Sequence, residues 1–378
     1  MNSDNIIVVD GQACSFSPGE TILEVAKRNG IDIPTLCYLK GASPTGACRI
    51  CLVEVEGARN LVASCAAPVA PKMVVRTESP RVVRARRTNI ELLLASGQHN
   101  CLVQEMNMDS WTDFQLKSIA TKEHESLCPA YGDCRLQELA VRYQVRTGHY
   151  TPTDTPYPIE NANPFIVRDF SRCILCGRCV QACNEIQVNN AISFGYRGWV
   201  AKVVTKGDRA LKDSDCVFCG ECVQACPVGA LIPKQDHIPP QSTLEAKKIR
   251  TTCSYCGVGC QLYLHVQDNR VTKVTGVEDL GPNYGSLCAK GRFGFDFIHD
   301  PGRLKAPLIR ENGKFREASW DEALSLVAEK LTKIKKESDP DSIMVLSSAR
   351  ITNEENYLAQ KFTRAVIGTN NIDHCARL

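Results

Sequence analysis

Eight cysteines in the middle of the chain form two runs with the same spacing, C-x2-C-x2-C-x3-C. Three closely spaced thiolates on a tight loop reach three corners of a [4Fe–4S] cubane, and the fourth cysteine, one helical turn later, points at the other cubane. Zinc and disulfides are the alternatives, but zinc sites usually pair two C-x2-C halves. The spacing therefore predicts two cubanes, one held by Cys173, Cys176, Cys179 and Cys226 and the other by Cys216, Cys219, Cys222 and Cys183.

A second group near the N-terminus reads Cys37-x10-Cys48-x2-Cys51-x13-Cys65, which suits a [2Fe–2S] cluster, with zinc as the alternative. The spacing differs from that of plant ferredoxins. It resembles the N-terminal ferredoxin domain shared by the large NADH-dehydrogenase subunit of complex I, iron-only hydrogenases and some formate dehydrogenases, which implies a β-grasp fold. Cys14 belongs to no run, and we expect it to be a small buried apolar residue.

A third group consists of His99, Cys101, Cys128 and Cys134. It resembles the histidine-ligated cubane motif of the same families, H-x3-C-x2-C-x5-C. The C-x5-C step is intact, whereas an insertion separates the first two cysteines and the histidine is displaced. His99 keeps the order of the motif, and His124, four residues before Cys128, is the alternative ligand. We predict His99, because neutral imidazole can replace a thiolate at iron.

The fourth group is Cys253-x2-Cys256-x3-Cys260-x27-Cys288, followed by Lys290-Gly-Arg. It resembles the N-terminal cubane of the molybdenum or tungsten bis-pterin oxidoreductases. In that family the lysine two residues after the last cysteine lies between the cubane and a pterin, which assigns a cofactor-binding role to Lys290. The alternative is a surface lysine. A cation at this position would favour the reduced, more negative cluster.

The remaining pattern indicates the elements that carry these groups. We expect a β-hairpin over 6–17, a helix over 21–29 and a helix from the Ser79-Pro80 cap to residue 96. Residues 150–165 are expected to form a linker, and 236–241 a second break. A capping box at Ser319 opens a helix with an apolar face, followed by a buried strand over 342–347 and a helix over 352–367 that ends at Gly368. These last elements begin a doubly wound domain.

We therefore predict an α+β multi-module iron–sulfur protein of five parts. They are a [2Fe–2S] β-grasp domain (1–78), a histidine-ligated cubane domain (79–150), a two-cluster ferredoxin domain (151–246), a pterin-type cubane domain (247–304) and the beginning of a bis-pterin oxidoreductase α/β domain (305–378).

Composition narrows the class of protein. The 378 residues include 21 cysteines, and no apolar run is long enough for a signal peptide or a membrane span. A cytoplasmic location and metal binding, in place of disulfides, are expected. The net charge of +3 favours no particular partner. Arg81, Arg84, Arg86 and Arg87 are expected to form the solvated face of a helix in preference to a nucleic-acid patch, so no nucleic-acid partner is expected.

The order of modules resembles the catalytic α subunit of a cytosolic, NAD(P)-linked or electron-bifurcating formate dehydrogenase. That implies oxidation of formate to CO2, or the reverse, at a Mo or W bis-molybdopterin guanine dinucleotide. Electrons would leave singly through one [2Fe–2S] and four [4Fe–4S] clusters to a flavin- and NAD(P)-binding diaphorase-type subunit, or to ferredoxin. The alternative is a non-catalytic electron-transfer subunit of a hydrogenase or formate dehydrogenase complex.

The C-terminal segment, residues 370–378, resembles the stretch that leads into the metal-ligating cysteine or selenocysteine of these formate dehydrogenases. The resemblance predicts that a UGA codon, which encodes selenocysteine or stop, follows Leu378, and that no catalytic residue lies within the 378 residues. A shortened electron-transfer subunit is the alternative.

Overall fold

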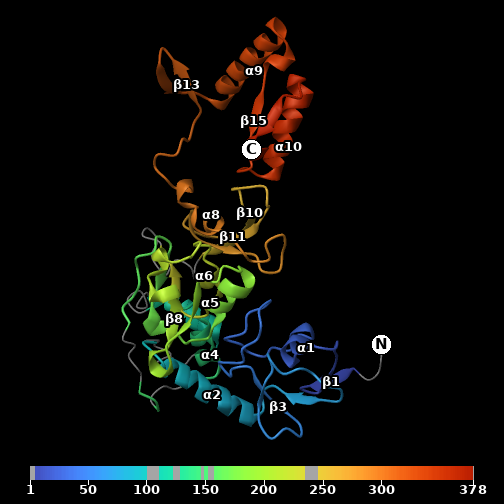
Figure 1. The fold of residues 1–378 in the computed structure, drawn as a ribbon, viewed down its shortest axis with the longest axis vertical. Coiled ribbons are helices and arrows are strands. Elements are labelled where there is room, and N and C mark those ends of the chain that lie inside the picture. The colour runs from blue at the N-terminus through green and yellow to red at the C-terminus, as the bar shows by residue number, and fades with distance from the viewer. Residues whose placement is uncertain are drawn as a thin grey trace. The chain divides into compact units, whose positions relative to one another are not determined.

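The computed structural model describes residues 5–99, 110–121, 128–145, 149–151, 157–234 and 246–377. Cys101, His124 and the predicted break at 236–241 lie outside the described residues. The chain divides into two compact units, Met1–Ala246 and Lys247–Leu378, and each is described by itself (Figure 1).

The N-terminal domain, residues 5–78, is a five-stranded mixed sheet with strand order β2-β1-β5-β3-β4 and one helix packed against it. The predicted hairpin is confirmed, since Asp10 and Gly11 both have the positive φ that a tight turn requires. The predicted helix is confirmed too, and Thr21 and Glu24 form a capping box at its start. The elements are β1 (Ile6–Val9), β2 (Gln12–Ser15), α1 (Ile22–Arg28), β3 (Leu52–Val55), β4 (Val62–Ala63) and β5 (Val74–Arg76).

A helical region follows, and its longest helix is α2 (Pro80–Ala95), capped by Ser79 as predicted. It packs with α3 (Trp111–Thr121) and α4 (Arg135–Arg142) around a core that includes Ile90, which we call the Ile90 core. Thiols from several cysteine groups pack against this core, namely Cys48, Cys128, Cys173, Cys176 and Cys226.

The prediction that Arg86 lies on a solvated helix face is wrong. Arg86 is fully buried, whereas Arg81, Arg84 and Arg87 are exposed. Val82, Arg86 and Ile90 follow one another at four-residue steps, so the arginine lies on the buried stripe of α2.

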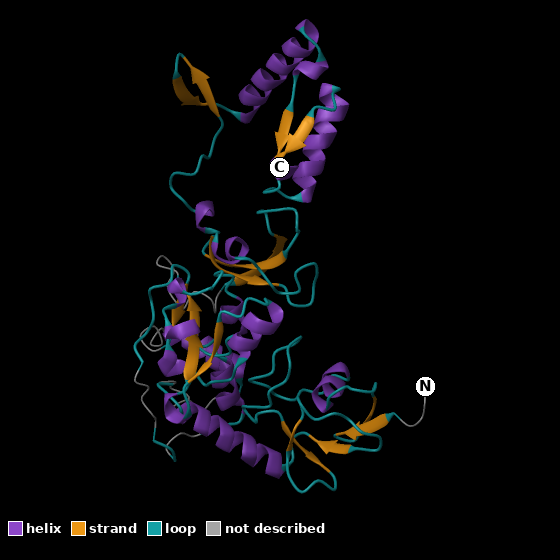
Figure 2. Cartoon of the chain, viewed as in Figure 1, coloured by secondary structure: helices purple, strands orange, loops and turns teal. Residues whose placement is uncertain are grey.

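The two-cubane module, residues 157–234, consists of short elements, and Figure 2 shows its strands as small pairs among helices and loops. β6 pairs with β9 and β7 with β8, both antiparallel. The elements are β6 (Ile166–Arg168), η3 (Phe170–Arg172), α5 (Arg178–Gln181), η4 (Ala182–Ile186), β7 (Ile192–Gly195), η5 (Gly198–Val200), β8 (Lys202–Thr205), η6 (Lys206–Asp208), η7 (Leu211–Asp213), α6 (Glu221–Ala225) and β9 (Leu231–Pro233).

The second unit begins with a three-stranded antiparallel sheet of order β10-β11-β12, against which a short helix packs. Its elements are β10 (Lys247–Thr252), β11 (Gln261–Gln267), β12 (Arg270–Gly276), α8 (Ala289–Phe293) and η8 (Asp296–Ile298).

The rest of the second unit has the predicted α/β order, because β15 and β16 are parallel and a helix connects them. The elements are β13 (Leu308–Glu311), β14 (Lys314–Glu317), α9 (Trp320–Glu337), η9 (Pro340–Ser342), β15 (Val345–Ser347), α10 (Asn353–Lys361), η10 (Phe362–Ile367), β16 (Ile372–His374) and η11 (Cys375–Arg377). Gly368 ends the α10–η10 helix with a left-handed φ of 92°, as predicted.

One prediction about this α/β part is wrong. The strand over 342–347 is not buried, since Leu346 is 76% exposed. The apolar face of α9, including Leu324 and Val327, is exposed, and none of the described residues of that helix is buried. The capping box is half formed, because Ser319 accepts the Glu322 N–H while the Glu322 carboxylate pairs with Arg316.

Candidate iron–sulfur cluster sites

The four cysteines of the N-terminal domain come together as two hydrogen-bonded pairs. The bond to Cys48 lowers the pKa of Cys37 to about 5 and raises that of Cys48, and the bond to Cys65 lowers the pKa of Cys51 to about 6 and raises that of Cys65. All four lie in loops or turns, and Cys51 and Cys65 lie at the same end of the antiparallel pair β3–β4. Thiolates are the form that binds iron, so this donor set fits a [2Fe–2S] cluster.

The loop that carries Cys48 and Cys51 is held from outside the domain by α2. Arg86 donates from Nε to the Ile50 carbonyl at 2.9 Å and from Nη2 to the Leu52 carbonyl at 2.8 Å. Asn89 donates to the Arg49 carbonyl at 3.0 Å. Buried carbonyls require such partners, so α2 fixes the backbone on both sides of Cys51.

The Arg86 guanidinium is also tied to α4 and to the start of α2. Its Nη1 lies 2.6 Å from Glu78 Oε1 and 2.7 Å from the Tyr143 hydroxyl, which itself donates to Glu78 at 2.8 Å. Arg86 is therefore a positioning residue that the sequence analysis missed. The signal was present, because an arginine between Val82 and Ile90 on a buried stripe needs acceptors.

His99 lies just beyond the end of α2 and is partly buried, and its Nε2 atom is inaccessible to solvent. Burial lowers the pKa of its imidazole to about 4, so the ring is neutral, and Nε2 has no hydrogen-bond partner in the part of the chain that is described. A neutral imidazole with a free nitrogen is the form that binds a metal. The backbone that leads to His99 passes close to the Ser171 carbonyl at Gly97. A glycine is needed there, since a Cβ would lie 2.1 Å from the Ser171 carbonyl oxygen.

Cys128 and Cys134 flank the turn that precedes α4. The Cys134 thiol lies 3.7 Å from the Pro227 carbonyl, and a Cβ at Gly229 would lie 3.1 Å from Cys128 Sγ. The two thiols thus gather near the segment that follows Cys226. With His99 they are candidates for the histidine-ligated cubane, and the remaining candidate, Cys101, is outside the described residues.

The two cysteine runs of the two-cubane module have matching backbones. Leu175 and Gly177 have φ of 51° and 79°, and Phe218 and Gly220, at the equivalent positions, have φ of 56° and 74°. A helix begins after each glycine. The left-handed backbone at these positions bends each loop tightly, as a loop that encloses a cluster requires.

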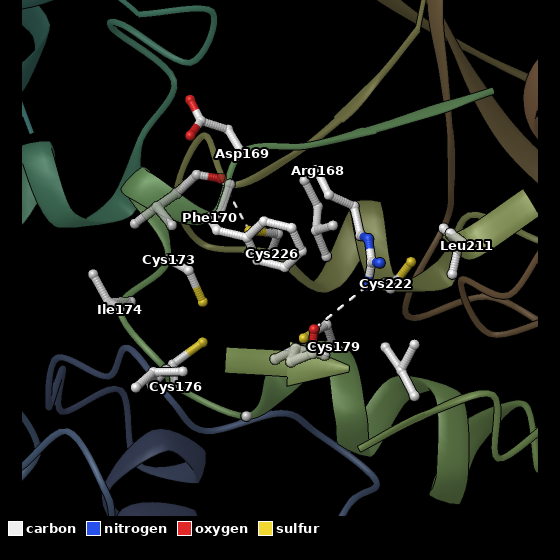
Figure 3. Close-up of a pocket in the computed structure, with 17 residues that line it drawn as sticks. Arg168, Asp169, Phe170, Cys173, Ile174, Cys176, Cys179, Leu211, Cys222 and Cys226 are labelled. Carbon is white, nitrogen blue, oxygen red and sulfur yellow. Dashed lines mark hydrogen bonds between the residues drawn. The ribbon is translucent and has the colours of Figure 1, made fainter. Parts of the chain in front are cut away.

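An apolar cavity brings Cys226 together with Cys173, Cys176 and Cys179, as the predicted crossing of the two runs requires (Figure 3). Figure 3 shows the sulfurs of Cys173 and Cys176 pointing into it. Burial raises the pKa of Cys173 to about 11 and of Cys176 to about 12. At neutral pH these thiols therefore keep their protons until a metal displaces them.

The second predicted set lies nearby. Burial raises the pKa of Cys216, and the charges of Cys219 and Cys183 also act on it. The Cys183 sulfur accepts the Ala191 N–H at 3.4 Å, and Cys222 is among the residues that line the apolar cavity. Among the described residues, no three Cys, His, Asp or Glu side chains converge tightly enough for a single metal ion. A cubane attaches each cysteine to a separate iron atom and needs a wider arrangement.

In the second unit, Cys253, Cys256 and Cys260 lie in the loop between β10 and β11, and Cys288 lies at the start of α8, where its charge acts on Cys253. The Cys253 N–H donates to the Cys260 carbonyl at 2.8 Å, and burial raises the pKa of both thiols. Lys290 is exposed on α8, and its charge acts on the Cys253 thiol. The structure therefore places the lysine beside the thiols and leaves its ammonium open to solvent.

Four families match successive parts of the chain. They are described as "2Fe-2S iron-sulfur cluster binding domain" (residues 6–80), "4Fe-4S dicluster domain" (172–230), "Molybdopterin oxidoreductase Fe4S4 domain" (246–300) and "Molybdopterin oxidoreductase" (303–378). The chain belongs to the molybdopterin oxidoreductases.

Two relatives of this molybdopterin oxidoreductase chain match over all of its length. "Probable oxidoreductase YjgC" of Bacillus subtilis is 31% identical, and "Putative formate dehydrogenase" of Staphylococcus aureus strain USA300 is 30% identical. The chain spans 40% and 39% of the length of these two relatives. In a solved NAD+-reducing [NiFe]-hydrogenase, one chain is similar with a TM-score of 0.51 and 31% identity, over 61% of this chain and 88% of that one.

None of the helices within the described residues is long and apolar enough to cross a membrane.

Proposed function

We propose that the chain belongs to a formate dehydrogenase, in which formate is oxidised to CO2, or CO2 reduced, at a Mo or W bis-pterin centre. The observation that carries the proposal is the presence of [2Fe–2S], dicluster and molybdopterin Fe4S4 domains in one chain. It is supported by the similarity, along the whole of this chain, to the protein named "Putative formate dehydrogenase".

The chain's own residues would serve the electron path. Twenty side chains, those predicted above, would hold one [2Fe–2S] and four [4Fe–4S] clusters, which together contain about 18 iron atoms. Iron–sulfur clusters transfer one electron at a time, whereas formate oxidation releases two. A relay in the same chain would separate the pair and deliver single electrons to a flavin- and NAD(P)-binding partner subunit.

Lys290 would contribute charge between the pterin-type cubane and the pterin. Its position on α8, beside the Cys253 thiol, supports this role. A cation there stabilises the reduced cubane and so favours its acceptance of an electron.

The test is reduction by the substrate. The enzyme, purified anaerobically from its host with its partner subunits, should contain Mo or W and about 18 iron atoms for this chain. Formate should reduce its clusters, as seen by EPR, to nearly the extent that dithionite does. A preparation that contains the clusters and Mo or W but shows no reduction by formate would exclude formate as the substrate.

A second candidate is an electron-transfer subunit without catalysis of its own. The similarity to a chain of an NAD+-reducing [NiFe]-hydrogenase, at 88% of that chain's length, favours it. In this case NADH and the partner subunit would reduce the clusters, while neither Mo nor W would copurify. Metal analysis of the native complex separates the two candidates.

A further inference from the structure

A buried arginine lies beside the thiols of the two-cubane module. Arg168, the last residue of β6, is 4% exposed. Its Nη2 binds the Glu160 carboxylate, its Nη1 lies 3.4 Å from the Val203 carbonyl, and its Cζ lies 5.0 Å from the centre of the Phe170 ring. The Nε–H has no hydrogen-bond partner among the described residues. An unpaired buried donor is unfavourable unless something accepts from it.

The place where this donor lies suggests the acceptor. Arg168 lines the cavity whose wall includes Cys173, Cys176, Cys179 and Cys226, and Cys222 of the other run lines it as well. Figure 3 shows the guanidinium extending across the cavity towards Cys222. The remaining wall is almost wholly apolar, so few protein atoms there can accept a hydrogen bond. Cysteine and sulfide sulfurs of a bound cubane are acceptors of the required kind.

Glu160 connects this arginine to both cysteine runs. One carboxylate oxygen binds Arg168, and the other accepts the Leu211 N–H at 2.8 Å. Arg168 stands five residues before Cys173, and Leu211 stands five residues before Cys216. Backbone bonds of 2.8 and 2.9 Å also join Glu160 to Arg168. A single carboxylate thus holds the two backbone segments that lead to Cys173 and Cys216, the first ligand of each run.

The charges of the pair have opposite effects on a cluster. Reduction adds negative charge to a cubane, and its potential depends on net charge, on hydrogen bonds to sulfur and on exposure. A buried cation close to the cubane stabilises the reduced state, because the low local dielectric strengthens the attraction. A carboxylate on the far side of the cation weakens this effect and holds the guanidinium in place.

We propose that Arg168 is a redox-tuning residue of the cubane held by Cys173, Cys176, Cys179 and Cys226, and that Glu160 positions it. Arg168 donates from Nε to a sulfur of this cluster and raises its reduction potential. The proposal deepens the relay within the proposed function. It depends on the dicluster domain and not on formate as substrate, so the two can fail separately.

The experiment is an EPR-monitored redox titration of the anaerobically purified holoenzyme and four variants. Arg168→Met removes charge and donor, Arg168→Lys keeps the charge, and Glu160→Gln removes the opposing carboxylate. Arg197→Met removes an exposed cation from the same module and is the control. Iron content is measured for each variant, so that loss of a cluster is distinguished from a change in its potential.

We expect Arg168→Met to lower the ratio of reduced to oxidised cubane at fixed potential about tenfold, a shift of about 59 mV for a one-electron couple. Arg168→Lys should recover most of the shift, and Glu160→Gln should shift the potential in the positive direction. Arg197→Met should leave it unchanged.

The proposal is overturned if Arg168→Met leaves every cluster potential where Arg197→Met leaves it. It is also overturned if Glu160→Gln and Arg168→Met shift the potential in the same direction, because that result indicates only a structural role. If Arg168→Met loses the cluster, the Glu160→Gln variant decides. A positive shift of the cluster potential supports the proposal, and a negative shift or none overturns it.

Discussion

The N-terminal domain and the two-cubane module hold their cysteines in different surroundings. The first has a five-stranded sheet and a core of fully buried side chains such as Ile7, Ile22 and Val25. The second has only two-stranded sheets, and Ile166 is the one member of this module among the largest fully buried side chains described. Isolated two-stranded pairs are marginally stable. In the module, the buried side chains of Ile174, Val228 and Ala230 belong to the Ile90 core and border a cavity that thiols also line. Bound clusters should therefore supply much of the module's stability.

The largest expected effect comes from removing the clusters. In protein prepared without iron, amide hydrogens of the two-cubane module should exchange with solvent within minutes, while β1, β3 and β5 keep much of their protection. The reason is that the sheet domain retains its apolar core and the module loses its metal crosslinks. Hydrogen exchange read by mass spectrometry, with and without iron, measures the contrast. Equal loss of protection in both regions would show that the N-terminal domain depends on its cluster as strongly as the two-cubane module depends on its own.

A smaller effect, the loss of one cluster, is expected from His99→Ala at the end of α2. Iron should fall by about 4 of about 18 atoms, and one EPR signal should disappear or shift. His124→Ala is the matched variant and should leave the iron content and all signals in place. The reverse pattern would assign the ligand to His124.

Arg86→Met should destabilise the N-terminal domain without removing a ligand. The change leaves the Ile50 and Leu52 carbonyls without their donor, which costs about 3 kcal/mol of unfolding free energy for the two groups together. Native-state hydrogen exchange of β3 measures this loss. Arg84→Met, an exposed change on the same helix, should stay within about 0.5 kcal/mol of the parent chain. Equal effects of the two substitutions would show that the buried contacts of Arg86 add no stability.

The smallest effect is expected at Cys14. This thiol is fully buried in the core of the N-terminal domain, with Sγ 3.5 Å from the Gln12 carbonyl. Cys14→Ala should reduce stability by about 1 kcal/mol and leave the iron content and EPR spectra unchanged. A lost [2Fe–2S] signal would place Cys14 among the ligands.

Much of the local structure could be predicted because its causes are local. Ser79 and Pro80 define the start of α2, and Asp10-Gly11 defines the first hairpin, since each involves only neighbouring residues. The buried character of Cys14 was also predicted correctly, because the residue had no place in any cysteine run.

What could not be predicted depends on distant parts of the chain. The carbonyls that accept hydrogen bonds from Arg86 belong to residues 50 and 52, more than 30 residues away in the sequence. Glu160 lies in a stretch expected to be a linker, but it binds Arg168 and Leu211 in the folded chain. The apolar spacing of α9 is real, but periodicity indicates which side of a helix is apolar and not whether another layer covers it.

The Ile90 core has a consequence for how the protein matures in the cell. Its side chains contact thiols from three of the predicted sites, through Cys48, Cys128 and Cys173. Each cluster that is delivered stiffens a wall that the next site shares, because a close-packed interior transmits small displacements. Cofactor insertion should therefore be cooperative, and a defect in one site should appear as slow or incomplete loading of its neighbours.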